Sequence, residues 1–342
     1  MTVLGTRALG RALLARQHLL ARTDLAPSEV IHHLGGLQAQ AVPQPPYLGL
    51  LSRLDAFSPE RLSTLIEQRA VVRIALQRGT IHLVTAEDCR TLRPLLQPVL
   101  DQALRTTYGK RLAGLDLDAL AAEARALVEA QPRTFQQLGA LLAVSRPDRD
   151  PAAHTTAEAW LGRPLDPSPS VDDLVLRYLA AFGPAGVADL QKWCGLSRLG
   201  AVLGRLAPRL LTFRDERGRL LYDLPEAPRP APDVPAPVRL VAPFDNLLLS
   251  HADRSRVLPE EYKGRVMTQN GLVLGTLLVD GLVVGTWRLT GEQEVVVQPF
   301  VRLTRADREA AEAEARRVLA FAGAGAGAGA GGDGVVRIEA AA

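Results

Sequence analysis

The clearest pattern of hydrophobic and polar positions lies in residues 171–224. Leu174, Val175, Tyr178 and Leu179 recur at helical spacing, and Gly183 with Pro184 ends the run. Two shorter helices are predicted over "GVADLQKWCGL" and "SRLGAVLGRLAPRL", and two β-prone runs then enclose the turn "DERG". Three helices followed by a β-hairpin is the element order of a winged helix-turn-helix unit, in which the hairpin is the wing.

The same order is predicted twice more, less clearly. Near the start, helices are predicted over "TRALGRALLARQHLL", "PSEVIHHLGGLQ" and "SPERLSTLIEQRAV", and two strands over "VVRIALQRGTIHLV" meet around Arg78 and Gly79. A middle unit contains the helical runs "LDALAAEARALVEAQ", "TFQQLGALLA" and "HTTAEAWLGRPL", and its sequence shows no evident wing. The pattern therefore predicts three tandem units of one kind.

After Pro225 the pattern changes. A proline-rich connector, "PEAPRPAPDVPAPV", precedes several strand-like segments, a closing amphipathic helix and a Gly/Ala-rich run that we interpret as disordered or a linker. We expect an α+β fold of three winged helices that form a concave DNA-binding channel, plus a C-terminal β-rich, barrel-like element. The predicted boundaries are 1–100, 101–168 and 169–226 for the three winged helices, 227–321 for the connector, β-rich element and closing helix, and 322–342 for the tail.

Composition narrows the class of protein only slightly. The 342 residues are 47% hydrophobic and 23% charged, as expected for a folded soluble chain. The first residues lack the apolar core of a signal peptide, and the most apolar segment is interrupted by Asp280 and several glycines. Cys89 and Cys194 lie far apart in unrelated contexts, which supports neither a disulfide framework nor a zinc ribbon. These features favour a cytoplasmic protein with no membrane association and no metal.

The net charge of +3 permits a polyanionic partner, and basic residues gather at two predicted wings. Winged helices bind DNA through a helix and a wing, with Lys and Arg neutralising phosphates. The alternative is that each arginine only solvates its helix face. The first group is Arg73, Arg78, His82, Arg90, Arg93, Arg105, Lys110 and Arg111, and the second is Lys192, Arg198, Arg205, Arg209, Arg214, Arg217 and Arg219.

Two glutamines, Gln38 and Gln40, flank one alanine between a predicted helix and a stiff, proline-rich turn. Neutral amides are poor acids and poor bases, so composition alone favours a polar helix end that meets solvent. A resemblance to a known family favours a functional role for the two glutamines instead. Three features of the sequence are involved: "LGGLQAQ" followed by "PPYLGLLSRL", then "RGTIHLVTAEDCR", then "APFDNLLLSHADRSRV". In order and spacing they resemble the winged-helix DNA glycosylases, the AlkZ-like and YcaQ-like enzymes of bacteria.

In that family the catalytic signature is a Gln, an intervening residue, and a Gln or Asp. Here Gln38-Ala39-Gln40 looks like the Gln-Gln, AlkZ-like branch, and Ala39 stands where a larger aliphatic residue is common. The resemblance implies a monofunctional glycosylase, without lyase activity, that excises bulky N7-alkylated purines and in some members unhooks interstrand crosslinks. It implies Gln38 and Gln40 as the catalytic residues and no cofactor.

Supporting residues are predicted on two other segments. Arg78 and His82 lie on or beside the first wing and could contact phosphate, although His82 is also compatible with a buried strand position. Asp245 is equally well explained as a turn cap. A polar cluster after an apolar strand completes the predicted DNA-binding set: Asp245, Asn246, His251 and Arg254.

Two readings from other classes remain open at this point. One is a sequence-specific winged-helix regulator without catalysis, which would not need Gln-x-Gln outside a recognition helix. Tandem, non-identical units also suit poorly the palindromic half-sites of dimeric repressors. The other is a catalytically silent binder of damaged DNA. For the enzyme we expect double-stranded DNA containing alkylated purines as partner, no protein partner, and a monomer.

Overall fold

The computed structural model describes residues 1–40, 44–142, 155–291, 293–325 and 334–341. Elements of the first predicted unit appear in the expected order: α1 (Thr6–Arg16), α2 (Pro27–His33), α4 (Pro59–Glu67) and a hairpin of β3 (Val71–Ala75) and β4 (Ile81–Thr85) around the 3-10 turn η1 (Gln77–Gly79). The short strand β2 (Leu37–Gln38) pairs antiparallel with β4 and gives the sheet order β2-β4-β3.

Two details of this region differ from the prediction. Gln38 lies on a strand and not at the end of a helix, because Gly35 and Gly36 turn the chain after α2 with φ of 65° and 100°. A Cβ on Gly36 would lie 2.6 Å from Val84 Cγ1, so the strand approaches β4 closely only because this residue is glycine. The expected stiff turn is helix α3 (Gln44–Leu51), whose two prolines lie in its first turn, where a missing N–H is tolerated.

The helices and the hairpin predicted for residues 171–224 are also present as individual elements. Helices α10 (Val171–Phe182), α11 (Val187–Cys194) and α12 (Leu199–Leu206), then the 3-10 turn η2 (Ala207–Arg209), precede the hairpin of β5 (Leu211–Asp215) and β6 (Leu220–Asp223). The N-terminal strand β1 (Val3–Leu4) pairs parallel with β5, so the start of the chain is fixed to this hairpin.

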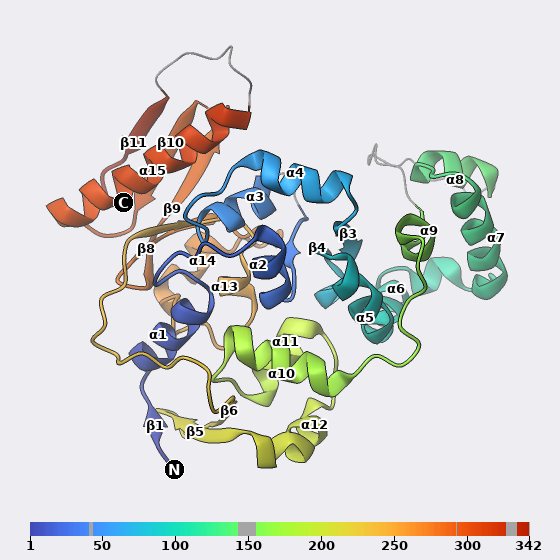
Figure 1. Ribbon diagram of the computed structural model, residues 1–342, viewed down its shortest axis with the longest axis horizontal. Coiled ribbons are helices and arrows are strands. Elements are labelled where there is room, and N and C mark those ends of the chain that lie inside the picture. The colour runs from blue at the N-terminus through green and yellow to red at the C-terminus, as the bar shows by residue number, and fades with distance from the viewer. Residues whose placement is uncertain (41–43, 143–154, 292, 326–333, 342) are drawn as a thin grey trace.

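The middle unit is helical throughout its described part. It contains α7 (Leu117–Ala130), α8 (Phe135–Leu141) and α9 (Ala157–Leu161). Figure 1 shows α7 and α8 at one side of the molecule, and α9 contacts α5. The predicted boundary at residue 100 is wrong, because it falls within α6 (Gln97–Leu112), the helix that follows α5 (Ala86–Leu95). Part of the run "HTTAEAWLGRPL", namely His154, lies outside the described residues.

The predicted barrel is wrong. The C-terminal strands form an open five-stranded sheet in the order β11-β10-β9-β8-β7, built from β7 (Arg239–Val241), β8 (Gly275–Val279), β9 (Leu282–Thr290), β10 (Glu294–Pro299) and β11 (Val335–Ile338). Between β7 and β8 lie α13 (Asn246–Leu249), the 3-10 turn η3 (Glu260–Tyr262) and α14 (Lys263–Val266), and α15 (Arg305–Gly325) packs on the sheet.

The predicted tail also needs correction at both ends. Residues 322–325 continue α15, and β11 pairs parallel with β10, with Glu294 opposite Val335. Residues 326–333 lie outside the described chain. The segment after the Gly/Ala run alternates exposed and half-buried positions and completes one edge of the sheet.

Two hydrophobic cores connect the predicted units. One joins the first unit, the third unit and the loop region after β7, with Leu13, Val175, Leu203 and Leu248 all fully buried or nearly so. The other joins the first unit to the C-terminal sheet and α15. Only one residue of the described middle helices α7 to α9 is classed as buried, Val128. The first, third and C-terminal parts therefore form one packed body, to which the middle helices add little core.

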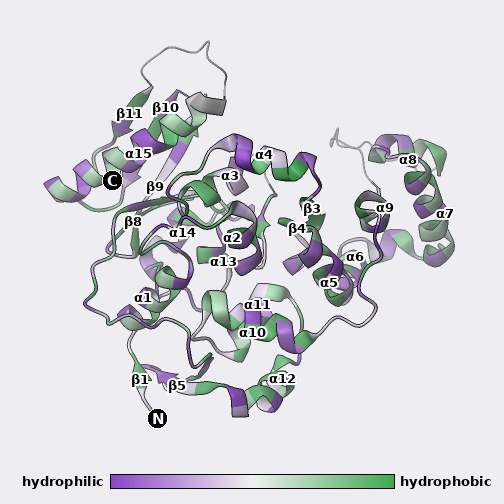
Figure 2. Cartoon of the chain, viewed as in Figure 1, coloured by the Kyte–Doolittle hydropathy of each residue, from purple (hydrophilic) through white to green (hydrophobic). Residues whose placement is uncertain are grey.

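Most helices carry hydrophobic and hydrophilic residues together, as Figure 2 shows. In the described ranges, no helix combines the length and the apolar character that a membrane span needs.

Candidate active site

Gln38 lies on β2 opposite His82 of β4, and the two side chains share one face of the small sheet. Gln38 is 7% exposed, and its Oε1 accepts a hydrogen bond of 2.9 Å from Nη2 of Arg78. The same nitrogen lies 3.3 Å from Nε2 of His82, and Nη1 of Arg78 donates to the carbonyl oxygen of Trp193 at 2.7 Å. The guanidinium thus joins β2, β4 and α11 at one point.

Arg78 is held at this point by its backbone as well. It adopts φ of 57° in the turn between β3 and β4, which is uncommon for a residue other than glycine. Burial lowers the pKa of Arg78 to about 10; Cys194 opposes this shift and the charge of Arg254 adds to it, so the two guanidinium groups lie within electrostatic range. At neutral pH Arg78 remains a cation. The guanidinium of the half-buried Arg78 thus bonds to groups of the protein, and its predicted phosphate contact stays a prediction.

His82 is neutral in this arrangement. Burial, and next the charge of Arg78, lower the pKa of His82 to about 3. Its Nδ1 lies 3.0 Å from the carbonyl oxygen of Thr80, which can only accept, so Nδ1 carries the proton and Nε2 accepts from Arg78. His82 is 1% exposed. It therefore supports Arg78 and is not placed to contact a phosphate.

Gln40 lies beyond the end of β2 and is exposed. Its Oε1 accepts a hydrogen bond of 3.1 Å from the backbone N–H of Ile81, and the N–H of Ala39 donates to the carbonyl oxygen of Ile81 at 2.8 Å. The Gln40 side chain thus supplies the acceptor for Ile81 that a backbone carbonyl of the neighbouring strand would supply in a regular β2–β4 ladder. Nε of Arg73, an exposed residue of β3, donates to the oxygen of Ala39 at 3.1 Å.

The C-terminal cluster packs behind this site. Asp245 accepts two 2.7 Å bonds from Arg53, with both side chains at most 1% exposed, and also caps α13 at the N–H of Leu247. Nδ2 of Asn246 donates to the oxygen of Gly36 at 2.6 Å, directly before β2. These bonds fix the turn that presents Gln38.

His251 is equally enclosed. Its Nε2 lies 3.0 Å from the oxygen of Phe182, and burial, with the charge of Arg256, lowers its pKa to about 3. Asp245, Asn246 and His251 are therefore supporting residues rather than the DNA contacts that the sequence suggests. Arg254 differs from them, because it is half-buried and only its Nε has a recorded acceptor among the described residues, the oxygen of Leu248.

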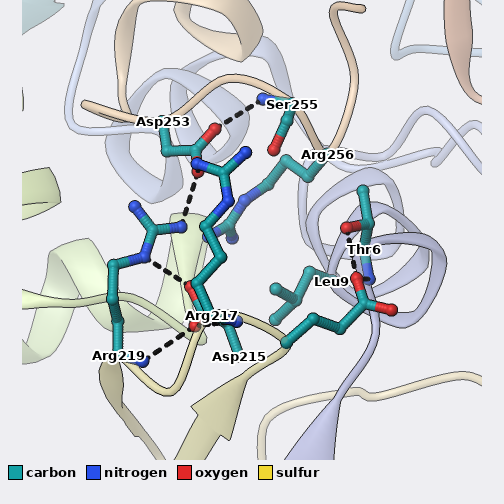
Figure 3. A pocket seen from close by; sticks show the side chains of 9 residues that line it. Thr6, Leu9, Asp215, Arg217, Arg219, Asp253, Ser255 and Arg256 are labelled. Atoms are coloured by element: carbon teal, nitrogen blue, oxygen red, sulfur yellow. Dashed lines mark hydrogen bonds and ion pairs between the residues drawn. The ribbon is translucent and has the colours of Figure 1, made fainter.

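Among the described residues, three of the seven members of the second basic group form ion pairs with neighbouring carboxylates. Arg205 pairs with Asp172, while Arg217 and Arg219 pair with Asp253. Figure 3 shows the pocket beside the pairs of Arg217 and Arg219 with Asp253. Its volume is about 40 Å³, which is room for a few water molecules. Its lining residues are Thr6, Leu9, Asp215, Glu216, Arg217, Arg219, Asp253, Ser255 and Arg256.

Sequence reasoning missed two partners of the site, Arg53 and the carbonyl of Trp193. Arg53 lies in the quoted stretch "PPYLGLLSRL", but nothing local indicates a bond to a residue 192 positions away. For the carbonyl of Trp193 the sequence offers a partial signal in Gly195, which has a φ of 87°. Because this residue lacks a Cβ, the end of α11 can approach the Arg78 backbone and Val99. Among the described residues, no group of three or more His, Cys, Asp and Glu side chains could hold a metal ion.

The chain is similar to DNA repair enzymes over nearly its whole length. The family model described as "DNA glycosylase AlkZ-like" matches residues 31–155 and 141–321. The chain belongs to the AlkZ-like DNA glycosylase family. The prediction of an enzyme of this class is thereby confirmed, against a regulator without catalysis.

A curated relative and a solved structure support the same family. The "Interstrand DNA cross-link repair glycosylase" of Streptomyces sahachiroi is 25% identical over 350 residues, which cover 89% of this chain and 92% of the relative. The solved structure of Streptomyces sahachiroi DNA glycosylase AlkZ superposes with a TM-score of 0.81 at 23% identity, over 99% of this chain and all of that one. The mixed α+β fold is therefore that of AlkZ.

Proposed function

We propose that this chain is a monofunctional DNA glycosylase that hydrolyses the N-glycosidic bond of bulky N7-alkylated purines in double-stranded DNA. Gln38 and Gln40 are the catalytic residues of the proposal. The observation that carries it is the pair of amides at one sheet edge, each with its oxygen fixed by a protein donor and with no carboxylate bonded to either among the described residues. The relative's name supports unhooking of interstrand crosslinks as part of the same activity.

The absence of an acid at the site matches the chemistry of this substrate. Alkylation at N7 makes guanine cationic, so the base departs as a neutral leaving group and needs no strong general acid. The nearby His82 is buried and neutral and cannot supply a proton. What remains is to hold the nucleotide and a water near C1′ while the sugar develops positive charge. Amides can do this, and they should discriminate against stable, neutral adducts.

We propose that DNA lies across the first wing, with phosphates contacted by residues whose cationic groups are not consumed in ion pairs. Arg73 donates to the carbonyl oxygen of Ala39, between the two glutamines, and Arg254 lies within electrostatic range of Arg78. Helix α6 packs beside the turn η1, and its exposed face carries Arg105, Lys110 and Arg111. Three winged helices around a concave channel, and action as a monomer, remain parts of this proposal.

The activity is tested with a duplex that carries one N7-alkylguanine. The duplex is incubated with the protein, abasic sites are converted to breaks with alkali, and a reaction without protein corrects for spontaneous depurination. Protein-dependent breaks at the lesion, and none without alkali, are expected. Tight binding with no breaks above the background would reject catalysis, and breaks without alkali would reject the monofunctional mechanism.

A further inference from the structure

The side-chain oxygen of each candidate catalytic amide accepts a hydrogen bond from another group of the protein. Gln38 accepts from the Arg78 guanidinium, and Gln40 accepts from the backbone N–H of Ile81. A guanidinium and a backbone N–H can only donate, so the atom that faces each of them must be Oε1 and not Nε2. The orientation of both amides is therefore determined by their hydrogen-bond partners.

The orientation of Gln38 is the more rigid of the two. Its partner Arg78 is anchored at Trp193 and His82 as well, and the side chain of Gln38 is 7% exposed. The Nε2 hydrogens point away from the atom that Arg78 holds, and among the described residues no acceptor is bonded to them. In contrast, Gln40 is exposed, and its oxygen keeps a lone pair for a water.

A cationic donor on the oxygen also changes the strength of the other end of the amide. Hydrogen bonds in a chain polarise one another, so an amide whose oxygen accepts from a guanidinium becomes a better N–H donor. The Gln38 oxygen, already engaged by a cation, becomes a poorer acceptor for a water. The geometry and the polarisation therefore both favour Gln38 as a hydrogen-bond donor through Nε2 over Gln38 as an acceptor.

We infer that Gln38 acts as a hydrogen-bond donor, through Nε2, to a phosphate or sugar oxygen of the target nucleotide, and that Arg78 is the positioning residue that fixes it in this orientation. The inference rests on the proposed glycosylase function and assigns different roles to the two glutamines. Gln38 holds the nucleotide, and the exposed Gln40 remains to orient the water. Arg78 then contributes to the rate through Gln38, not through a phosphate of its own.

Gln38→Glu tests the donor role directly. Glutamate has nearly the same shape and accepts well from Arg78, but its carboxylate has no hydrogen to donate. Under single-turnover conditions we expect Gln38→Glu to lose roughly ten- to a thousandfold in excision rate, as much as Gln38→Ala. If Gln38 instead accepted from the water, the carboxylate would keep or raise the rate, and this result would overturn the inference. Gln293→Glu, in the exposed β9–β10 turn, is the matched control for the added charge.

A double-mutant cycle tests Arg78. Arg78→Ala should lower the rate in the presence of Gln38 and should have no further effect on Gln38→Ala, since its action passes through that residue. Guanidinium ion should restore part of the Arg78→Ala rate relative to sodium at equal ionic strength. Equal rate losses in both backgrounds, or a loss confined to duplex affinity, would show that Arg78 is not a positioning residue. Arg305→Ala, whose side chain is 93% exposed on α15, controls for the lost charge.

The same variants separate this inference from the function on which it rests. A wild-type rate for Gln38→Ala would reject the proposed site itself. A slow Gln38→Ala with an active Gln38→Glu would leave the glycosylase proposal standing and reject only the donor role. A methylphosphonate beside the lesion then identifies the acceptor. The Gln38→Ala defect should vanish on that duplex if the acceptor is a phosphate oxygen, and should persist if it is a sugar oxygen.

Discussion

Replacing Asp245 with Ala should destabilise the fold and leave no specific defect in DNA contact. Asp245 and Arg53 are at most 1% exposed, and the two bonds between them are 2.7 Å. Removing one partner of such a pair leaves a buried charge without compensation, which costs about 3–5 kcal/mol. Loss of the N-cap of α13 adds about 1 kcal/mol. The expected decrease in the free energy of unfolding is therefore about 4–6 kcal/mol.

Urea unfolding followed by circular dichroism measures this decrease. The control is Asp172→Ala, which breaks a surface pair with Arg205 and should leave the free energy of unfolding nearly unchanged, because solvent screens exposed pairs. Arg53→Met combined with Asp245→Ala should recover part of the loss, because it removes the uncompensated charge. If Asp245→Ala unfolded like the wild type but bound duplex more weakly, Asp245 would be a DNA contact and the structural role assigned to it would be wrong.

Three further predictions concern the whole protein. Duplex affinity should fall linearly with salt on a log-log plot, with a slope set by the phosphates neutralised, and a nearly flat response would reject phosphate as the main contact. Excision should proceed fully in EDTA, whereas a loss restored by a divalent ion would show that a metal takes part. His82 and His251 have pKa values lowered by burial to about 3, below the ordinary 6.5, so the unfolded chain binds more protons between these limits. Stability should therefore fall as pH decreases from 6.5 toward 3, with no effect of either histidine above 6.5, and calorimetry at several pH values should show it.

The sequence predicts local elements well where periodicity and turn residues coincide. The hairpin around Arg78 and Gly79 and the three helices of residues 171–206 are present as expected. Helix α3 is missed because Pro45 and Pro46 suggest a turn, although both positions in a first helical turn tolerate proline. The strand β2 is missed because two residues are too short to show an alternating pattern.

Of the candidate site, the sequence predicts the two glutamines of the motif but not the residues that hold them in place. Gln38 and Gln40 come from the resemblance, while their partners come from tertiary contacts that no local pattern contains. Arg78 donates to Trp193, 115 positions away, and to Gln38, 40 positions away, and neither bond is visible in a local pattern. The open sheet replaces a barrel because β7 and β11 form separate edges that do not pair with each other, and strand propensity alone carries no information about closure.

The central claim is that Gln38 and Gln40 carry the excision of N7-alkylated purines. The most direct measurement is the single-turnover rate constant on one defined N7-alkylguanine duplex for the wild type, Gln38→Ala, Gln40→Ala and Gln40→Asp, with Gln293→Ala as control. Each alanine variant at 38 or 40 should lose roughly ten- to a thousandfold while circular dichroism and duplex affinity stay near the wild type. Gln40→Asp should retain more activity than Gln40→Ala, because a carboxylate there can stabilise the developing positive charge on the sugar. Wild-type rates for both alanine variants would show that the two glutamines are structural, Gln38 as an acceptor for Arg78 and Gln40 as an acceptor for Ile81, and that the catalytic groups lie elsewhere.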